Sequence, residues 1–364
     1  MAESRRSFLR TLGRSAVLAP IFSALPLRNS KEGFESNTAE AAPLRRASFL
    51  QPPVQALGVP NLPFTMDGNV KVFRLTPEPV TIQFPDMSDP HGQRRRSILA
   101  WGYNGSVTGP TIEATEGDRV RIIVENRLPE PTSVHWHGLH VPIGMDGVTG
   151  ISQAPIKPGE TFIYEFTLEQ HGTYFYHPHF MGAKQVGMGM AGFFIIHPKN
   201  PAPWQVVDRE YAFFLQTWMI HPGSPVPDTM AMSEFNYFTF NGRAAPDVPL
   251  MQARSGERIR IRLANLSMLS HPIHLHGHSF TVTDYGAGFL PPHQHMLANT
   301  VSVSAGEARA IDFVAGKPGK WVMHCHFLHH VMNDMHRTPI PGGGGGDHAG
   351  HEMGGMFTAI EVKA

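Results

Sequence analysis

The sequence predicts an all-β protein in which two β-sandwich domains follow one another. Gly and Pro account for 36 and 32 of the 364 residues, and both residue types favour turns between short strands. Short stretches that alternate apolar and polar residues indicate half-buried strands. The clearest of them are Val120–Val124, Phe162–Phe166, Ile259–Leu263 and Ala310–Phe313. The mature chain shows no long helical period, so the pattern favours sandwiches over mixed folds.

The second half of the chain repeats the first. Two pairs of segments share an offset of 139 residues, and two further pairs share an offset of 147. The pairs are Gly117–Ile122 with Gly256–Ile261, His135–Gly138 with His274–Gly277, Pro158–Glu160 with Ala305–Glu307, and Tyr176–Phe180 with Met323–Phe327. The change of offset indicates an insertion around Gly286–His295. We expect domain 1 at 60–200 and domain 2 at 210–364, with a linker over Pro198–Pro203.

The N-terminal residues are typical of an export signal. Ser4–Arg10 resembles the twin-arginine consensus, and an apolar run follows over Ala16–Leu27. That run of about 12 residues is too short to span a bilayer and has the length of a signal core. Ala39–Ala41 is a candidate cleavage site. We therefore exclude residues 1–45 from the fold and expect a periplasmic or secreted protein without a membrane span.

Four His-x-His pairs stand at equivalent positions of the two repeats. Residues i and i+2 of a strand point to the same face, so each pair presents two imidazoles side by side. A single pair is weak support for a metal site, but eight imidazoles cannot all be satisfied inside a core. Neutral imidazole suits Cu, Zn, Fe or Ni. The pairs are His135 with His137, His177 with His179, His274 with His276, and His324 with His326.

The single cysteine narrows the choice of metal. A lone Cys is most often a buried core thiol, but Cys325 lies inside His324–His326, with His330 and Met335 at steps of five residues and His271 upstream. One thiolate, two imidazoles and a distant thioether form the ligand set of a blue-copper centre, whereas zinc favours more cysteines. We predict that His271, Cys325, His330 and Met335 bind one copper ion.

The repeat supplies an internal control for this site. The domain 1 positions equivalent to His271, Cys325, His330 and Met335 are Thr132, Pro178, Ala183 and Met188. Three of the four ligand types are therefore missing from domain 1, although both of its His-x-His pairs are present. We expect one blue-copper site, in domain 2, and a separate cluster formed by the eight paired histidines.

These motifs resemble, in their order, the four copper motifs of the multicopper oxidases, and the resemblance spans the mature chain. It implies cupredoxin domains with a Greek-key topology and four copper ions per functional unit, one of type 1, one of type 2 and two of type 3. The implied ligands are His271, Cys325, His330 and Met335 for type 1, His135 and His274 for type 2, His137, His177 and His326 for one type 3 ion, and His179, His276 and His324 for the other.

The chain departs from the family in having room for only two domains, where laccase-like members usually have three. It resembles the two-domain, small-laccase-like branch, in which the cluster forms between domain 1 of one subunit and domain 2 of the next. The resemblance therefore implies a homotrimer, because a head-to-tail contact that closes gives a ring. The formal net charge of zero gives no reason to expect a nucleic-acid partner.

The resemblance implies a laccase-like activity, in which phenolic or aromatic donors lose one electron at a time and O2 is reduced to water. We expect electrons to enter through the edge of His330 and to pass from Cys325 along the chain to its two neighbouring histidines. Asp146 matches an acid that the family places near type 2 copper, although a structural role in a turn explains this Asp equally well. Val331 stands where three-domain relatives often have Glu, and Asp334 is a weak candidate for a second acid.

Other readings of the donor and of the function stay open. Cu(I) oxidation is an alternative, because thioethers prefer Cu(I). The methionines near the second His-x-His pair are equally well explained as core-filling residues. The His- and Met-containing tail is equally well explained as a flexible loop before a last strand over Phe357–Val362. A copper-sequestering protein without turnover is a further alternative, but it would not need eight ordered imidazoles. A copper nitrite reductase has its type 1 Cys in the first domain, where this chain has Pro178. The residues concerned are Met181, Met188 and Met190, and in the tail Gly342–Gly346, His348, His351, Met353 and Met356, of which Met353 and Met356 rival Met335 as axial ligand.

Overall fold

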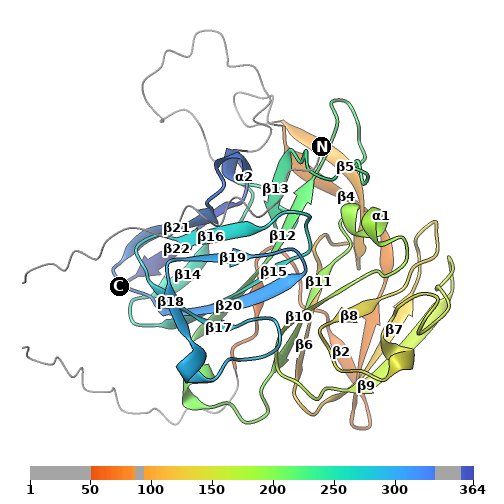
Figure 1. Ribbon diagram of the computed structural model, residues 1–364, viewed down its shortest axis with the longest axis horizontal. Coiled ribbons are helices and arrows are strands. Elements are labelled where there is room, and N and C mark those ends of the chain that lie inside the picture. The colour runs from red at the N-terminus through yellow and green to blue at the C-terminus, as the bar shows by residue number, and fades with distance from the viewer. Residues whose placement is uncertain (1–50, 87–93, 333–353) are drawn as a thin grey trace, which may run out of the picture. The chain divides into compact units, whose positions relative to one another are not determined.

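The computed structural model of the chain describes residues 51–86, 94–332 and 354–364. The predicted export signal, Met335, Asp334 and the tail residues His348, His351 and Met353 lie outside the described residues. Within that part the chain is built of strands, with α1 (Gly182–Gly187) and α2 (Leu328–Met332) as short α-helices. None of its helices is long and apolar enough to cross a membrane. The all-β prediction is confirmed (Figure 1).

Domain 1 is a sandwich of two four-stranded sheets whose apolar faces meet in one core. One sheet has the order β2 (Phe64–Asp67), β3 (Val70–Leu75), β7 (Arg119–Glu125) and β9 (Thr161–Thr167). The other has the order β6 (Gly109–Thr115), β11 (Gly192–His197), β10 (Gly172–His177) and β8 (His135–His137). Trp136 is fully buried between the sheets, with its ring 5.1 Å from that of Tyr164. A separate ribbon pairs β4 (Pro77–Pro85) with β5 (Arg95–Tyr103).

Domain 2 repeats this arrangement with larger sheets. Its seven-stranded sheet contains β1 (Gln55–Ala56), β12 (Arg209–Trp218), β15 (Arg258–Asn265), β20 (Glu307–Val314), β17 (Phe280–Asp284) and β18 (Met296–Ala298) in that order, with β13 (Tyr237–Phe240) paired to β12. Its five-stranded sheet has the order β14 (Met251–Arg254), β22 (Phe357–Lys363), β21 (Gly319–Cys325), β16 (His271–Leu275) and β19 (Thr300–Val303). Each domain is thus a cupredoxin-like sandwich, and the chain carries two in tandem.

The backbone shows the repeat that the sequence predicts. Strand β8 pairs with β10 in antiparallel register, and β16 pairs with β21 in the same way. Before the equivalent strands β7 and β15, Gly117 and Gly256 adopt nearly identical left-handed conformations, with φ of 89° and 88°. Such a φ strains any residue with a Cβ, which explains why both turns carry glycine.

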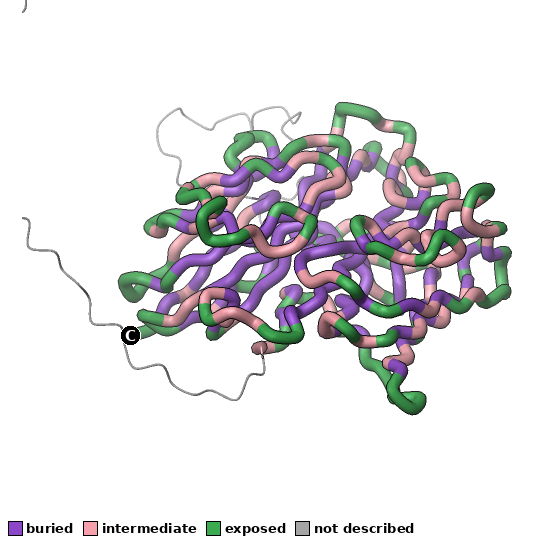
Figure 2. Tube along the Cα trace, turned by 60° about the horizontal axis from the view of Figure 1, so that its bottom comes forward, coloured by how far each residue is buried: buried purple, intermediate pink, exposed green. Residues whose placement is uncertain are grey.

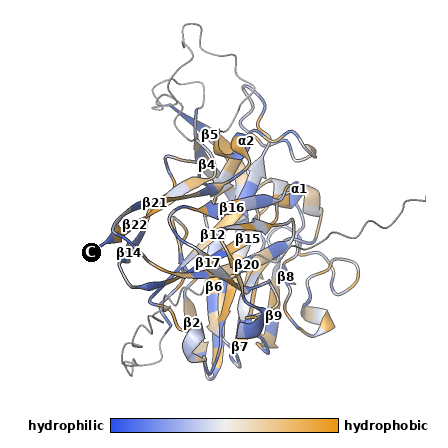
Figure 3. Ribbon diagram, turned by 60° about the vertical axis from the view of Figure 1, so that its left-hand side comes forward, coloured by the Kyte–Doolittle hydropathy of each residue, from blue (hydrophilic) through white to orange (hydrophobic). Residues whose placement is uncertain are grey.

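The prediction that all four alternating stretches are half-buried is correct for β7 and β9 and wrong for β15 and β20. Strand β15 is buried on both faces, and β20 is buried over nearly its whole length. The second face of β15 is covered from domain 1, where the Thr173 hydroxyl accepts a hydrogen bond of 2.7 Å from Arg262. Figure 2 shows that buried residues run along the central strands of the molecule, and Figure 3 shows that hydrophilic and hydrophobic residues are mixed along the strands.

A network of fully buried charges fills this second face. Arg262 is paired with Glu210 at 2.6 Å, and Arg260 donates two hydrogen bonds to the Asp312 carboxylate, at 2.8 and 2.7 Å. Asp284 of β17 in turn accepts a hydrogen bond of 2.8 Å from the backbone N–H of Thr173. Burial opposes the ionisation of Glu210, but the positive charges of Arg262 and Arg260 outweigh it and hold the pKa of Glu210 below its usual range. These contacts fix β10, which carries His177, onto domain 2.

Removing one member of this network is expected to destabilise the protein strongly. Arg262→Ala leaves Glu210 buried without its nearest partner, and we expect a loss of about 3–5 kcal/mol in the free energy of unfolding. Arg209→Ala is the matched control, because its ion pair with Glu257 is partly exposed and should contribute no more than about 1 kcal/mol. Urea unfolding of both variants checks the difference, and equal losses would contradict the role of the buried network.

Candidate metal centre

The paired strands bring the histidines of each repeat together. In domain 1 the Cα atoms of His135 and His177 are register partners across β8 and β10. In domain 2 His274 and His324 are partners in the same way across β16 and β21. The remaining four histidines lie at or just beyond the ends of these strands, so each domain gathers four imidazoles at one end of its sheet.

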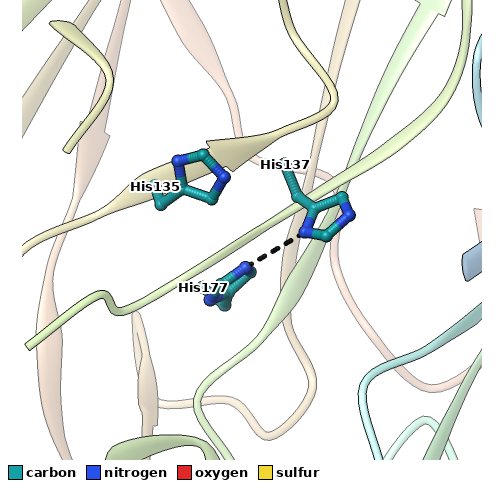
Figure 4. Close-up of side chains that lie close together, drawn as sticks. All are labelled: His135, His137 and His177. Atoms are coloured by element: carbon teal, nitrogen blue, oxygen red, sulfur yellow. Dashed lines mark hydrogen bonds between the residues drawn. The ribbon is translucent and has the colours of Figure 1, made fainter. Parts of the chain in front are cut away.

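The domain 1 histidines converge closely enough to bind a metal ion (Figure 4). Nδ1 of His137 lies 3.3 Å from Nε2 of His177. One ring nitrogen from each of His135, His137 and His177 lies within 4.8 Å of the other two. The ring of His179 completes the group, with its centroid 5.6 Å from that of His135.

The domain 2 histidines also lie close together, although of the two groups only that of domain 1 brings three ring nitrogens within 4.8 Å of one another among the described residues. Nε2 of His276 lies 3.1 Å from Nε2 of His324. The centroid of the His274 ring lies 4.9 Å from that of His276 and 5.6 Å from that of His326. In both domains, therefore, two imidazoles present ring nitrogens to each other at a distance that favours a shared cation.

Four of the eight rings contact a backbone carbonyl through Nδ1. In each, Nδ1 lies within hydrogen-bonding distance of a carbonyl oxygen, so a neutral ring donates from Nδ1 and leaves Nε2 as an electron-pair donor. This outer hydrogen bond is a common feature of metal-binding histidines. The contacts are His135 with Asp146 O at 2.7 Å, His177 with Pro178 O at 3.1 Å, His274 with Asn299 O at 2.7 Å and His324 with Cys325 O at 2.8 Å.

The two groups of four stay separate within one chain. Among the described residues, every ring contact within this set of eight joins histidines of the same domain. Burial lowers the pKa of His177 to about 3, and it also lowers the pKa of His324. Each group therefore offers neutral imidazoles but brings no more than four of them together.

The cysteine site lies inside domain 2 and is fully buried. Sγ of Cys325, at the end of β21, lies 3.2 Å from Nδ1 of His330 on α2 and 3.8 Å from Nδ1 of His271 on β16. The two Nδ1 atoms lie 3.0 Å apart. None of the three side chains is exposed. These are three of the four residues that the sequence predicts for type 1 copper, and they converge on one point.

Burial keeps these three groups uncharged without a metal. It lowers the pKa of His271 to about 3 and that of His330 to about 2, so that both rings are neutral. It raises the pKa of the Cys325 thiol to about 12. A bound cation must therefore displace the thiol proton, and the resulting thiolate gives the site the soft anionic ligand that copper prefers. The donor set fits a copper ion.

Met335, the fourth predicted ligand, lies outside the described residues. Met356, a rival in the sequence, is fully buried in the apolar core that also contains Cys325. Its backbone N–H donates to the carbonyl of His330 at 2.9 Å, and its carbonyl accepts from the N–H of Cys325 at 3.1 Å. Met356 therefore lies beside the site and packs its core, which accounts for its burial without a role as ligand.

Domain 1 fills the equivalent space with hydrogen bonds. Thr132, the counterpart of His271, is fully buried and its hydroxyl donates to the Gln185 side chain at 2.7 Å. The Gln185 amide nitrogen then donates to Glu130 at 2.9 Å. Met188 and Met190 are buried, and Met190 packs in the domain 1 core, as expected for core filling. Met181 is 60% exposed.

Asp146 contacts His135 mainly through its backbone. Its carbonyl oxygen lies 2.7 Å from Nδ1 of His135 and its carboxylate Oδ1 lies 3.4 Å from the same atom. The turn fits closely against the strand, because a Cβ on Gly147 would lie 1.8 Å from the carbonyl oxygen of Val134. Asp146 therefore positions the ring of His135.

Three contacts around the ligands had no signal in the sequence. The hydroxyl of Ser267 lies 2.8 Å from Nε2 of His271, opposite the nitrogen that faces Cys325. Asn299 and Thr300 both contact Nδ1 of His274. These residues come from loops and strand ends with ordinary composition, and only the fold brings them to the ligands.

Comparison with known proteins identifies the family. Two multicopper oxidase models match the chain, one over residues 87–201 and the other over residues 220–340. The blue copper oxidase of Nitrosomonas europaea is similar in structure, with a TM-score of 0.67 and 30% identity over 80% of this chain and 85% of that one. These matches imply a copper oxidoreductase. The chain belongs to the multicopper oxidase family.

A second solved structure is about equally similar, whereas the curated relatives match over shorter segments. The multicopper oxidase mgLAC matches with a TM-score of 0.65 and 30% identity, over 80% of this chain and 86% of that one. Copper resistance protein A of Pseudomonas syringae pv. tomato is 43% identical over 125 residues, and the protein of that name in Escherichia coli is 43% identical over 115 residues. These segments cover 34% and 32% of this chain but only 20% and 18% of the relatives.

Proposed function

We propose that the protein is a laccase-like oxidase that takes single electrons from phenolic or aromatic donors and reduces O2 to water. The observation that carries the proposal is the combination of one buried Cys-His-His group with two groups of four histidines. When bound, the copper ions supply one-electron acceptance at the cysteine site and reduction of dioxygen at the histidine cluster. A copper-binding protein without turnover does not need separate sites for electron acceptance and for dioxygen reduction.

We assign the copper ligands as the sequence and its family resemblance indicate. His137 and His177 already face each other, as do His276 and His324, and each pair would share an ion with one histidine of the other domain. The assignment is His271, Cys325, His330 and Met335 for type 1, His135 and His274 for type 2, His137, His177 and His326 for one type 3 ion, and His179, His276 and His324 for the other.

Protein groups account for the steps around the metals. Cys325 is followed and preceded directly by histidines of the cluster, so the backbone gives a short covalent path between the two sites. The Asp146 carbonyl orients His135, and we propose that its carboxylate supplies protons to the cluster. The buried Cys325 site excludes water, which keeps the soft ligands unhydrated.

We further propose that the functional unit is a homotrimer. The two groups of histidines are complementary in number but separate within one chain, and a head-to-tail ring of three subunits would place domain 1 of one against domain 2 of the next. The N-terminal segment, with Ser4–Arg10, supports export by the twin-arginine route to the periplasm or beyond. We keep 60–200 and 210–364 as the proposed domain bounds.

Oxidation of Cu(I) is the second candidate. It is favoured by the similarity to proteins named copper resistance protein A and by the exposed thioether of Met181. In this case the electron donor is a metal ion rather than an aromatic ring, and the rest of the machinery is unchanged.

A visible spectrum combined with oxygen uptake tests the proposal. We expect the copper-loaded protein to show an intense blue band at about 600 nm and to consume oxygen with a phenol faster than with Cu(I). Comparison of a phenol, a non-phenolic dye and Cu(I) at equal concentrations ranks the donors. A blue band without oxygen uptake on any of the three would contradict the oxidase function and favour copper binding alone.

A further inference from the structure

His330, the proposed type 1 ligand, is not at the surface, contrary to the expectation that electrons enter through its edge. Its side chain is fully buried, and its Nδ1 faces Cys325 and His271. Its other nitrogen, Nε2, is also buried and has no hydrogen-bond partner among the described residues. An electron donor in solvent therefore cannot touch this ring and needs an intermediate group.

The neighbouring residue His329 is exposed and lies directly against the buried ring. The centroids of the His329 and His330 rings are 4.2 Å apart, with an angle of 74° between their planes. His329 also stacks on Phe327 at 5.9 Å and meets the edge of Phe238 at 5.7 Å. The His329 ring is thus held between aromatic neighbours in a position that connects solvent with the ligand.

The surface around His329 suits a flat aromatic molecule. Phe327 and Leu328 directly precede His329 in the chain and are 44% and 69% exposed. Aromatic and aliphatic surface favours stacking with an aromatic ring, and the imidazole can hydrogen-bond with a phenol hydroxyl.

We propose that His329 is the electron-entry residue for small aromatic donors, an inference that rests on the proposed oxidase function. A phenol docks on Phe327, Leu328 and His329, and loses one electron through the His329 and His330 rings. With copper bound at Cys325, this electron would reduce Cu(II) to Cu(I), the hydroxyl proton of the phenol would pass to solvent, and the phenol would leave as a phenoxyl radical. Two rings in contact provide the path, so the proposal requires an aromatic ring at position 329 and not specifically an imidazole.

Anaerobic stopped-flow reduction of the blue band by a phenol tests this step separately from oxygen reduction. We expect His329→Ala to slow reduction at least about tenfold, whereas His329→Phe keeps the ring and stays within about threefold of the wild type. His293→Ala is the matched control, because His293 is also exposed and lies outside the proposed site. The blue spectrum and the reduction potential should be unchanged in all three variants.

A second measurement does not depend on turnover. Diethyl pyrocarbonate modifies exposed histidines, and mass spectrometry locates the products. We expect benzamide, a redox-inert aromatic, to protect His329 and not His293.

Three results would each overturn the proposal. His329→Ala could be reduced by the phenol at the wild-type rate, or His329→Phe could be slowed as much as His329→Ala. Benzamide could also fail to protect His329 from diethyl pyrocarbonate. A wild-type protein that is bleached by phenol but consumes no oxygen would refute the oxidase function instead, and the role of His329 would still be decided by the variants.

Discussion

Cys325→Ser is expected to abolish both the blue band and oxidase activity. Sγ of Cys325 is buried and lies 3.2 Å from Nδ1 of His330, so no other soft anionic ligand is available at this point among the described residues. A serine hydroxyl is a poor donor for copper, and its pKa keeps it protonated. Copper analysis should show the loss of one ion per chain, while the histidine cluster keeps its metal.

A control separates loss of the ligand from loss of the core. Cys325 packs in the apolar core of domain 2 together with Val331, which is 4% exposed. Val331→Ala removes apolar volume beside the site without removing a ligand, and we expect about 1–3 kcal/mol of destabilisation with the blue band retained. If Cys325→Ser kept the blue band, or if Val331→Ala lost it in a folded protein, the assignment of the thiolate ligand would be wrong.

The part of the site that the sequence predicts is the part that depends on local spacing. A two-residue period on a strand places His135 and His137 on one face, and the repeat then places His274 and His276 equivalently in domain 2. The grouping of Cys325 with His330 rests instead on the ligand types of a blue-copper centre, and in the structure α2 brings His330 back to the end of β21. The structure brings these residues together as the spacing indicates.

What the sequence does not predict depends on which surfaces meet. The alternation in β15 indicates a polar face, but a polar face can be covered when its charges are paired, as Arg262 and Glu210 are. The exposure of His329 and the burial of His330 follow from the way α2 packs on β13 and β21, which no local period encodes. Ser267 contacts His271 for the same reason, since loop packing decides it.

Co-assembly of two inactive variants is expected to restore activity if the cluster forms between subunits. His137→Ala disables the domain 1 group and leaves the domain 2 group intact, whereas His326→Ala does the reverse. In a ring of three that contains both variants, one interface joins the intact domain 1 of one chain to the intact domain 2 of the next. Each heterotrimer should therefore show about one third of the wild-type oxygen uptake, whichever variant is in excess.

The measurement requires trimers that contain both chains. Co-expression with two different tags, followed by purification on each in turn, removes the inactive homotrimers. The matched control combines His137→Ala with a chain that carries both substitutions, since that ring has no intact domain 1 group and should stay inactive. Heterotrimers that keep the blue band but show no oxygen uptake would place the complete cluster within a single chain. Restored activity would instead explain why neither group of four histidines reaches the other within one chain, because each completes the group of a neighbouring subunit.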